Sequence, residues 1–203
     1  MFKQAIGTVH ANAVFSRRAR VLGEAIRDLL PMGSSVLDVG TGDGTIARLW
    51  KAGRPDLRVE GIDVFVRPNP KIPVSVFDGR TLPFADGSFD IVTFVDVLHH
   101  ADDARKLLHE AARVARKSVV IKDHYAENWL DDKTLALMDW VGNAPHGVAL
   151  PYKYWSRSEW NQAFNDSGLS VDILQTRIPL YPLPLSLAFG RNLHFLARLQ
   201  ISG

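Results

Sequence analysis

The fold is decided by the stretch Val36-Leu37-Asp38-Val39-Gly40-Thr41-Gly42-Asp43-Gly44. Three aliphatic residues around one acid predict a buried strand, and the glycines that follow predict a turn into a helix. Glycine permits unusual backbone angles and lets main-chain N–H groups come close to a ligand. The stretch therefore predicts a strand, a turn and a helix with a ligand site at the turn.

The spacing of the glycines argues against a phosphate ligand. A dinucleotide-binding turn, Gly-x-Gly-x-x-Gly, would need glycine at position 45, which is threonine. A P-loop would need lysine directly after its last glycine, and no lysine follows until Lys51. Asp38 and Asp43 would repel a pyrophosphate and attract a ligand that carries positive charge. A cationic, nucleoside-like ligand fits the turn best.

Further segments follow the turn in a fixed order. Residues 57–64 read as a second strand ending in Asp63, about 20 residues past the turn, where a carboxylate can bind a ribose diol. Residues 75–79 read as the end of a third strand, and 88–100 as a fourth strand with its exit. With the glycine turn, these segments resemble the class I S-adenosylmethionine-dependent methyltransferases, of the type similar to the quinone-biosynthesis and small-molecule enzymes.

This resemblance is good over about residues 30–125. It implies S-adenosylmethionine as the cofactor, with Asp38 binding the methionine ammonium through water and Asp63 binding the ribose hydroxyls. It further implies that Asp78 accepts from the adenine amino group, while Val64 and Phe65 press on the adenine ring. The other cofactor-binding positions that it implies are Gly40, Gly42, Gly44, Gly79 and Asp96.

The apolar pattern predicts a single α/β domain over 1–203. Strands are expected at 35–39, 58–63, 73–77, 89–95, 118–122, 169–178 and 193–199, and helices at 12–30, 44–52, 103–116, 132–141 and 156–167. With the resemblance, this order implies a doubly wound, mostly parallel, seven-stranded Rossmann-like sheet whose last strand is antiparallel. The helix at 12–30 precedes the sheet.

Two connections are unusual for such a layout. About 30 residues, within 124–155, separate the fifth strand from the helix at 156–167, and they are rich in tryptophan, tyrosine and histidine. They predict an aromatic cover over a pocket, although each aromatic could instead belong to a small helical core. The apolar segment 179–185, stiffened by prolines, could line the pocket or make a subunit contact.

Composition narrows the functional class. The chain has no cysteine, which excludes cysteine-type zinc sites, iron–sulfur radical chemistry and a cysteine nucleophile. Arg17, Arg18 and Arg20 are expected on the solvated side of the N-terminal helix, so the net charge of +2 does not indicate nucleic-acid binding. Without a signal-peptide pattern or an apolar run long enough to span a bilayer, the expected location is the cytoplasm.

Histidines at strand exits are the candidates for a general base. His99 follows the fourth strand, His124 follows the fifth, and His146 lies in the expected cover. Of these, His124 and His146 are preferred, and Asp123 could orient His124. Because neighbouring strand residues point to opposite sides, only one of each adjacent pair is expected to face a ligand.

No metal is expected, because the chain lacks the usual ligand spacings. A magnesium site on Asp96 and Asp123, of the catechol methyltransferase type, is the alternative.

The predicted function is methyl transfer from S-adenosylmethionine to a small or medium apolar metabolite, at oxygen or carbon. The Asn/Asp-Pro-Pro-Tyr/Phe tetrapeptide of amino-methylating nucleic-acid enzymes is absent after the fourth strand, where residues 94–97 stand. The expected partner is therefore a small-molecule acceptor, without nucleic acid, and a homo-oligomer stays open. The alternatives are a non-catalytic S-adenosylmethionine-binding protein, a nucleic-acid methyltransferase of another motif type and, less favoured, an NAD-dependent oxidoreductase.

Overall fold

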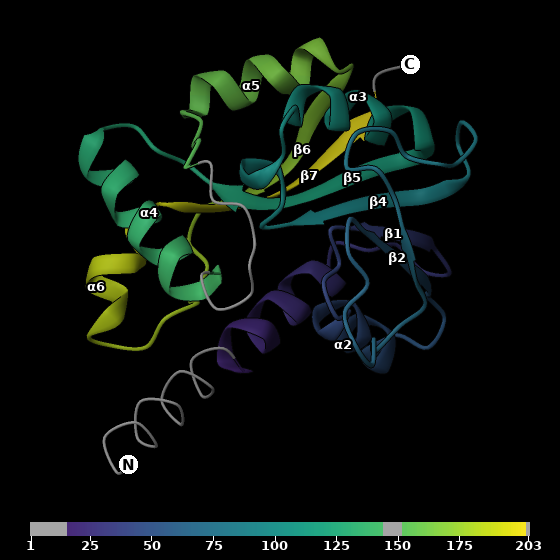
Figure 1. Cartoon of the computed structure of the whole chain (residues 1–203), viewed down its shortest axis with the longest axis horizontal. Helices are drawn as coiled ribbons and strands as arrows, with labels where there is room; N and C mark the ends of the chain where they lie inside the picture. Colours follow the sequence, from purple (N-terminus) through teal and green to yellow (C-terminus); the bar gives the residue numbers. More distant parts are fainter. Residues whose placement is uncertain (1–15, 144–151, 202–203) are drawn as a thin grey trace.

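The computed structural model describes residues 16–143 and 152–201, and a seven-stranded sheet forms its centre (Figure 1). The strand order is β3-β2-β1-β4-β5-β7-β6; the first five of these strands pair in parallel, and β7 is antiparallel to both of its neighbours. The strands are β1 (Ser35–Val39), β2 (Arg58–Asp63), β3 (Val74–Val76), β4 (Phe89–Val95), β5 (Ala115–His124), β6 (Leu169–Gln175) and β7 (His194–Ile201). The predicted fold class is confirmed.

Helices cover both faces of the sheet (Figure 1). A helix that includes residues 16–27 lies with α2 (Thr45–Gly53) on one face, and α3 (Ala104–Val114) lies with α5 (Arg157–Asp166) on the other. Beyond the carboxyl end of β5, α4 (Trp129–Asn143) lies beside α6 (Leu185–Phe189). A short 3-10 helix, η1 (Leu98–His100), follows β4.

The central strand β4 explains why the sheet needs both layers of helices. Its side chains alternate, so that Ile91 belongs to the same core as Leu22 of the first helix, whereas Val92 belongs to the same core as Leu108 of α3. Six of its seven residues are buried, which is why most of the strand is apolar in the sequence.

Several element boundaries differ from those predicted. β5 extends to residues 115 and 124 because β4 offers a partner at Phe89 and β7 offers one at His194. β6 ends at Gln175 and not at 178, and α4 is longer than the predicted 132–141. α6 was not predicted, because five residues after a proline-rich segment are too short for a helical period.

The position of β1 and β4 defines where a ligand would bind. They are neighbours in the sheet although β2 and β3 lie between them in sequence. Open α/β sheets bind ligands outside the carboxyl ends of the strands at such a switch in strand order. The glycine turn follows β1 there. Within the described ranges, no helix is long and apolar enough to cross a membrane.

Candidate active site

The glycine turn folds tightly onto the exits of β2 and β4. The Gly40 N–H donates to the Ile62 carbonyl at 2.8 Å, and the Gly42 N–H donates to Asp63 Oδ2 at 2.8 Å. Gly40 has φ of 70°, and a Cβ there would lie 2.5 Å from Val97 Cγ2. The third glycine, Gly44, precedes α2 as its N-cap. Only glycine fits at position 40, which explains the sequence motif in terms of the protein's own packing.

Asp38 is a buried acid at the end of β1. Its carboxylate accepts hydrogen bonds from Thr41 Oγ1 at 2.6 Å and from Thr93 Oγ1 at 2.7 Å. Burial raises the pKa of Asp38 to about 6, and the two threonine hydroxyls oppose that rise. None of the described basic residues forms an ion pair with it, so an ammonium ligand would supply the missing positive charge.

Asp63 stands at the end of β2 beside exposed apolar side chains. It accepts from the Gly42 N–H and, at 3.2 Å, from the Phe65 N–H. A carboxylate has about four acceptor positions, so room remains for two hydroxyl groups. Val64 and Phe65 are 62% and 66% exposed, which leaves apolar surface next to the acid. Both features fit a nucleoside.

Asp78 and Gly79 bring the exit of β3 to the same edge. Asp78 Oδ1 accepts from the backbone N–H groups of Arg80 and Thr81, each at 2.8 Å, and these bonds lower the pKa of its carboxyl. A Cβ on Gly79 would lie 3.0 Å from Val64 Cγ1, so the two loops are in contact. The residues predicted to hold the cofactor on β1, β2 and β3 therefore share one edge of the sheet.

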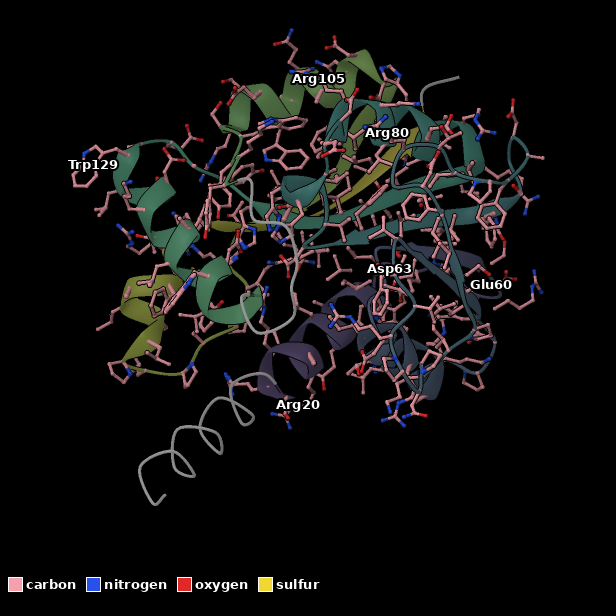
Figure 2. All side chains as sticks on the ribbon, in the orientation of Figure 1. Arg20, Glu60, Asp63, Arg80, Arg105 and Trp129 are labelled. Atoms are coloured by element: carbon pink, nitrogen blue, oxygen red, sulfur yellow. The ribbon has the colours of Figure 1, made fainter. Side chains whose placement is uncertain are left out.

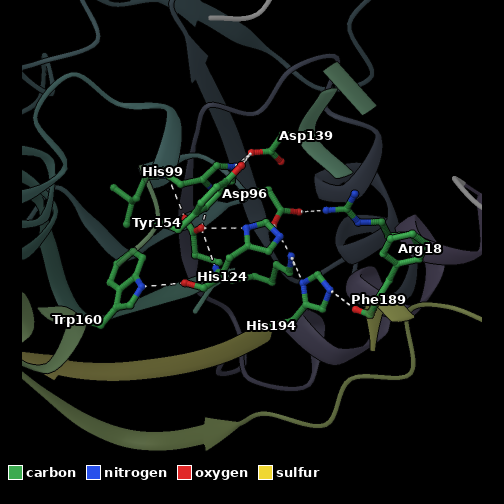
Figure 3. Close-up of polar contacts among 12 residues, drawn as sticks. Arg18, Asp96, His99, His124, Asp139, Tyr154, Trp160, Phe189 and His194 are labelled. Atoms are coloured by element: carbon green, nitrogen blue, oxygen red, sulfur yellow. Dashed lines mark hydrogen bonds and ion pairs between the residues drawn. The ribbon is translucent and has the colours of Figure 1, made fainter. Parts of the chain in front are cut away.

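A buried polar cluster lies next to this edge, at the exits of β4 and β5 and the start of β7 (Figure 3). Lys122 is fully buried and forms an ion pair with Asp96, which forms a second ion pair with Arg18. His194 Nδ1 lies 3.4 Å from Lys122 Nζ, and His194 Nε2 lies 3.0 Å from the Phe189 carbonyl. Strand, helix and loop residues thus meet in one network.

Charge pairing keeps Asp96 ionised inside the protein. Burial opposes its ionisation, but Lys122 and Arg18 hold the pKa of its carboxyl well below the usual range. Burial lowers the pKa of Lys122. Burial and the nearby positive charge of Lys122 together lower the pKa values of His124 and His194 well below the usual value for histidine. His124 is therefore a neutral imidazole at physiological pH. The magnesium alternative at Asp96 and Asp123 is not supported, because two cations already neutralise Asp96.

Asp123 connects the two histidines at the strand exits. Its Oδ1 lies 2.6 Å from His99 Nδ1 and 3.3 Å from His124 Nδ1, while Oδ2 accepts from the Leu98 N–H at 3.1 Å. Asp123 and His124 are neighbours on the strand, and both side chains reach one cluster at its end. The carboxylate predicted to orient His124 therefore holds His99 as well.

His99 continues the network toward α4. Its Nε2 lies 3.6 Å from Asp139 Oδ2, and the Tyr154 hydroxyl donates to the same carboxylate (Figure 3). Burial disfavours the charged imidazole, but Asp123 and Asp139 outweigh it and raise the pKa of His99 to about 10. The Trp160 indole N–H donates to the His124 carbonyl at 2.9 Å and fixes the β5 exit from the other side.

A cavity of about 190 Å³ reaches His99. Trp155 of the predicted aromatic segment lines it together with Trp160 of α5, so part of that segment does border a pocket. Trp129 and Trp140 are 73% and 58% exposed, and Figure 2 shows Trp129 pointing outward from the start of α4. These two do not form a cover. His146, a predicted base, lies outside the described residues.

Sequence reasoning missed several residues of the cluster. The prediction that Arg18 lies on the solvated side of the first helix was wrong, because Arg18 forms an ion pair with Asp96. Arg20 does point outward, as predicted (Figure 2). Lys122 carried a signal, because a lysine interrupts the apolar run of a central strand. Asp139 also carried one, because it follows the buried Leu135 by four positions on the same face of α4. His194 carried none, since only the register of β7 places it beside His124.

Comparison with known proteins agrees with this geometry. The methyltransferase domain family matches residues 14–173. A demethylmenaquinone methyltransferase of Thermotoga maritima is 34% identical over 107 residues, 49% of this chain and 45% of that protein. A 2-methyl-6-phytyl-1,4-hydroquinone methyltransferase of Synechocystis is 32% identical over 125 residues, 56% of this chain and 38% of that protein. The chain spans less than half the length of these relatives.

The fold has close counterparts among solved structures. A protein solved in complex with the Haloferax volcanii Trm112 methyltransferase activator aligns with a TM-score of 0.69 at 21% identity, covering 91% of this chain and 90% of that one. The family match over most of the sequence, the strand order and the acids at the sheet edge lead to one conclusion. This chain belongs to the methyltransferase domain family, and its cofactor is S-adenosylmethionine.

Proposed function

We propose that this protein transfers a methyl group from S-adenosylmethionine to the oxygen or an acidic carbon of a small or medium apolar acceptor. The observation that carries the proposal is the buried cluster of His99, Asp123 and His124 beside the cofactor edge, because it can take a proton from such an acceptor. Relatives whose names specify menaquinone and hydroquinone compounds support an aromatic hydroxylated acceptor.

The proposed cofactor contacts follow from the edge formed by β1 to β3. Asp38 would face the ammonium group, Asp63 the two ribose hydroxyls and Asp78, through Oδ2, the adenine amino group. Val64 and Phe65 would cover the adenine ring, and the three turn glycines would leave room for the methionine part. Asp96 would border the cofactor site while its ion pairs hold Arg18 and Lys122 in place.

In the proposed reaction, the cofactor supplies an electrophilic methyl group on a sulfonium, and the carbon–sulfur electron pair stays with sulfur. His124, which is neutral, would accept the acceptor's proton at Nε2 as the new bond to carbon forms. Asp123 would hold the ring through Nδ1, and the surrounding buried side chains would exclude water. His146 stays a second candidate base of this proposal, whereas His99, charged in the cluster, would be a positioning residue.

Incubating the protein with S-adenosylmethionine and a panel of quinols, phenols and non-hydroxylated analogues tests the function. We expect S-adenosylhomocysteine to form with hydroxylated apolar acceptors only, and His124→Gln to lower turnover without changing cofactor affinity. Cofactor binding without turnover on any acceptor would favour the non-catalytic alternative.

Asp63→Ala is expected to weaken S-adenosylhomocysteine binding by at least tenfold, since a charge-assisted hydrogen bond contributes about 1.5–3 kcal/mol. Isothermal titration calorimetry measures the affinity. Glu60→Ala is the matched control, because Glu60 is an exposed acid on the same strand. An Asp63→Ala variant with the affinity of the Glu60→Ala control would refute the assignment.

The affinity for S-adenosylhomocysteine is expected to fall as the pH falls through 6. Because the pKa of Asp38 is raised to about 6, its carboxylate becomes neutral below that pH and loses its attraction for the ammonium group. At pH 5, one unit below this pKa, only about a tenth of the Asp38 carboxyl groups are ionised. Binding at pH 5 should therefore be about tenfold weaker than at pH 8. Asp38→Asn should remove this dependence; an Asp38→Asn variant that keeps it would contradict the proposed contact.

A further inference from the structure

A second group of side chains lies beside the cluster, where η1 meets α4. His99, His100 and Asp139 each offer a metal-ligating atom, and these atoms lie within 4.8 Å of one another. An ion about 2.1 Å from each ligand atom needs them about 3.4 Å apart in a tetrahedral arrangement. His99 Nε2 and Asp139 Oδ2 are already 3.6 Å apart. Small side-chain movements would therefore complete the site.

Both histidines have a ring nitrogen without a partner in this group. His99 Nε2 and His100 Nδ1 are buried, and neither has a hydrogen-bond partner among the described residues. The His99 side chain is only 3% exposed. Buried polar atoms are nearly always paired, so two such nitrogens on adjacent residues indicate a missing partner. A cation that accepts nitrogen lone pairs satisfies both.

The surroundings also prepare the residues for this role. The Asp123 carboxylate, 2.6 Å from His99 Nδ1, holds the proton on that nitrogen, so Nε2, which faces Asp139, is the nitrogen that gives up its proton when an ion binds. This carboxylate–histidine arrangement is typical behind metal-binding histidines. The Tyr154 hydroxyl donates to Asp139 and fixes the third ligand in the same way.

Charge balance and access complete the argument. Asp123 and Asp139 place two negative charges around His99. A divalent cation balances both of these charges, whereas a single proton on His99 Nε2 balances only one of them. The cavity of about 190 Å³ that reaches His99 provides a path from the surface. Two imidazoles and one carboxylate suit a late first-row dication better than magnesium, which prefers oxygen ligands.

We propose that His99, His100 and Asp139 bind a divalent transition-metal ion of the zinc class, and that its open coordination position takes an oxygen of the methyl acceptor. Three protein ligands and one free position are the usual arrangement where a metal ion acts on a substrate. The ion site stands on the geometry alone. The contact with the acceptor rests on the proposed function.

Titration of the chelator-treated full chain with Zn²⁺ tests the site. We expect one ion per chain, and at least tenfold weaker binding for His100→Ala and for Asp139→Asn. His109→Ala is the matched control, because His109 is an exposed histidine on α3. S-adenosylhomocysteine binding, measured on every variant, shows that each is folded and that the cofactor edge is intact. Failure to bind Zn²⁺, or equal affinity in the wild type and both site variants, would overturn the ion site.

A second measurement separates this inference from the proposed function. If the ion takes the acceptor oxygen, chelator treatment should reduce turnover at least tenfold while S-adenosylhomocysteine affinity stays the same, and Zn²⁺ should restore turnover in the wild type but not in Asp139→Asn. Full turnover after chelation would overturn the acceptor contact while leaving methyl transfer established. Failure of the proposed function would instead appear as no turnover with or without the ion.

Discussion

Replacing Asp123 with alanine is expected to lower the free energy of unfolding by about 3–5 kcal/mol, the cost of removing one partner from a buried ion pair. The carboxylate is fully buried, and it accepts hydrogen bonds from the His99 ring and from the backbone N–H groups of Leu98 and His124. It also lies near the His124 ring. Alanine would leave these donors buried without an acceptor. Urea denaturation followed by circular dichroism measures the loss, with a chelator present so that no bound ion contributes.

The control for this prediction is Asp132→Ala on α4. Asp132 is an exposed acid in the first turn of that helix, so its removal should cost less than about 1 kcal/mol. Asp123→Asn, which keeps an acceptor oxygen, should lose less stability than Asp123→Ala. Equal unfolding free energies for Asp123→Ala and the Asp132→Ala control would show that the cluster does not stabilise the fold.

Gly40→Ala is expected to destabilise the protein by about 2–5 kcal/mol. At φ of 70° an alanine costs about 1–2 kcal/mol in backbone strain. Its Cβ would also lie 2.5 Å from Val97 Cγ2 and 2.8 Å from Val97 Cγ1, an overpacking that typically costs about 1–3 kcal/mol. Because the turn would move away from the exit of β4, S-adenosylhomocysteine affinity should fall as well. Denaturation and calorimetry measure the two effects.

Gly33→Ala separates the two causes. Gly33 has φ of 67°, and nothing lies within 4 Å of a Cβ built there, so only the strain of the backbone is expected. In a double-mutant cycle, Val97→Ala should relieve part of the cost of Gly40→Ala, since it removes the two methyl groups in the way. A Gly40→Ala variant as stable as Gly33→Ala would mean that the contact with Val97 is readily relieved.

The order of elements and the position of three acids at one edge of the sheet could be predicted because their signals are local. The apolar runs of β1 and β4 report burial on both faces, and the glycines at 40–44 report a turn whose positive φ angles favour glycine. Asp63 ends β2 and Asp78 lies in the loop just after β3, so parallel pairing brings them to one edge. These features need only a few consecutive residues to be recognised.

The buried cluster could not be predicted in the same way, because its contacts join distant parts of the chain. Arg18 meets Asp96 across 78 positions, and Lys122 meets His194 across 72. A lysine, an arginine or a histidine in isolation is usually a surface residue, and burial is tolerated only where opposite charges meet. That meeting depends on the antiparallel register of β7 and on the packing of the first helix, which the sequence pattern does not specify.

The sequence by itself thus determined the sheet, its carboxyl edge and the identity of the acids that lie there, since strand periodicity and turn chemistry are properties of short segments. The tertiary structure decided the chemistry opposite that edge. It placed His99 between two carboxylates and left His124 neutral beside Lys122, because the charge of a buried histidine depends on neighbours that come from other elements of the fold.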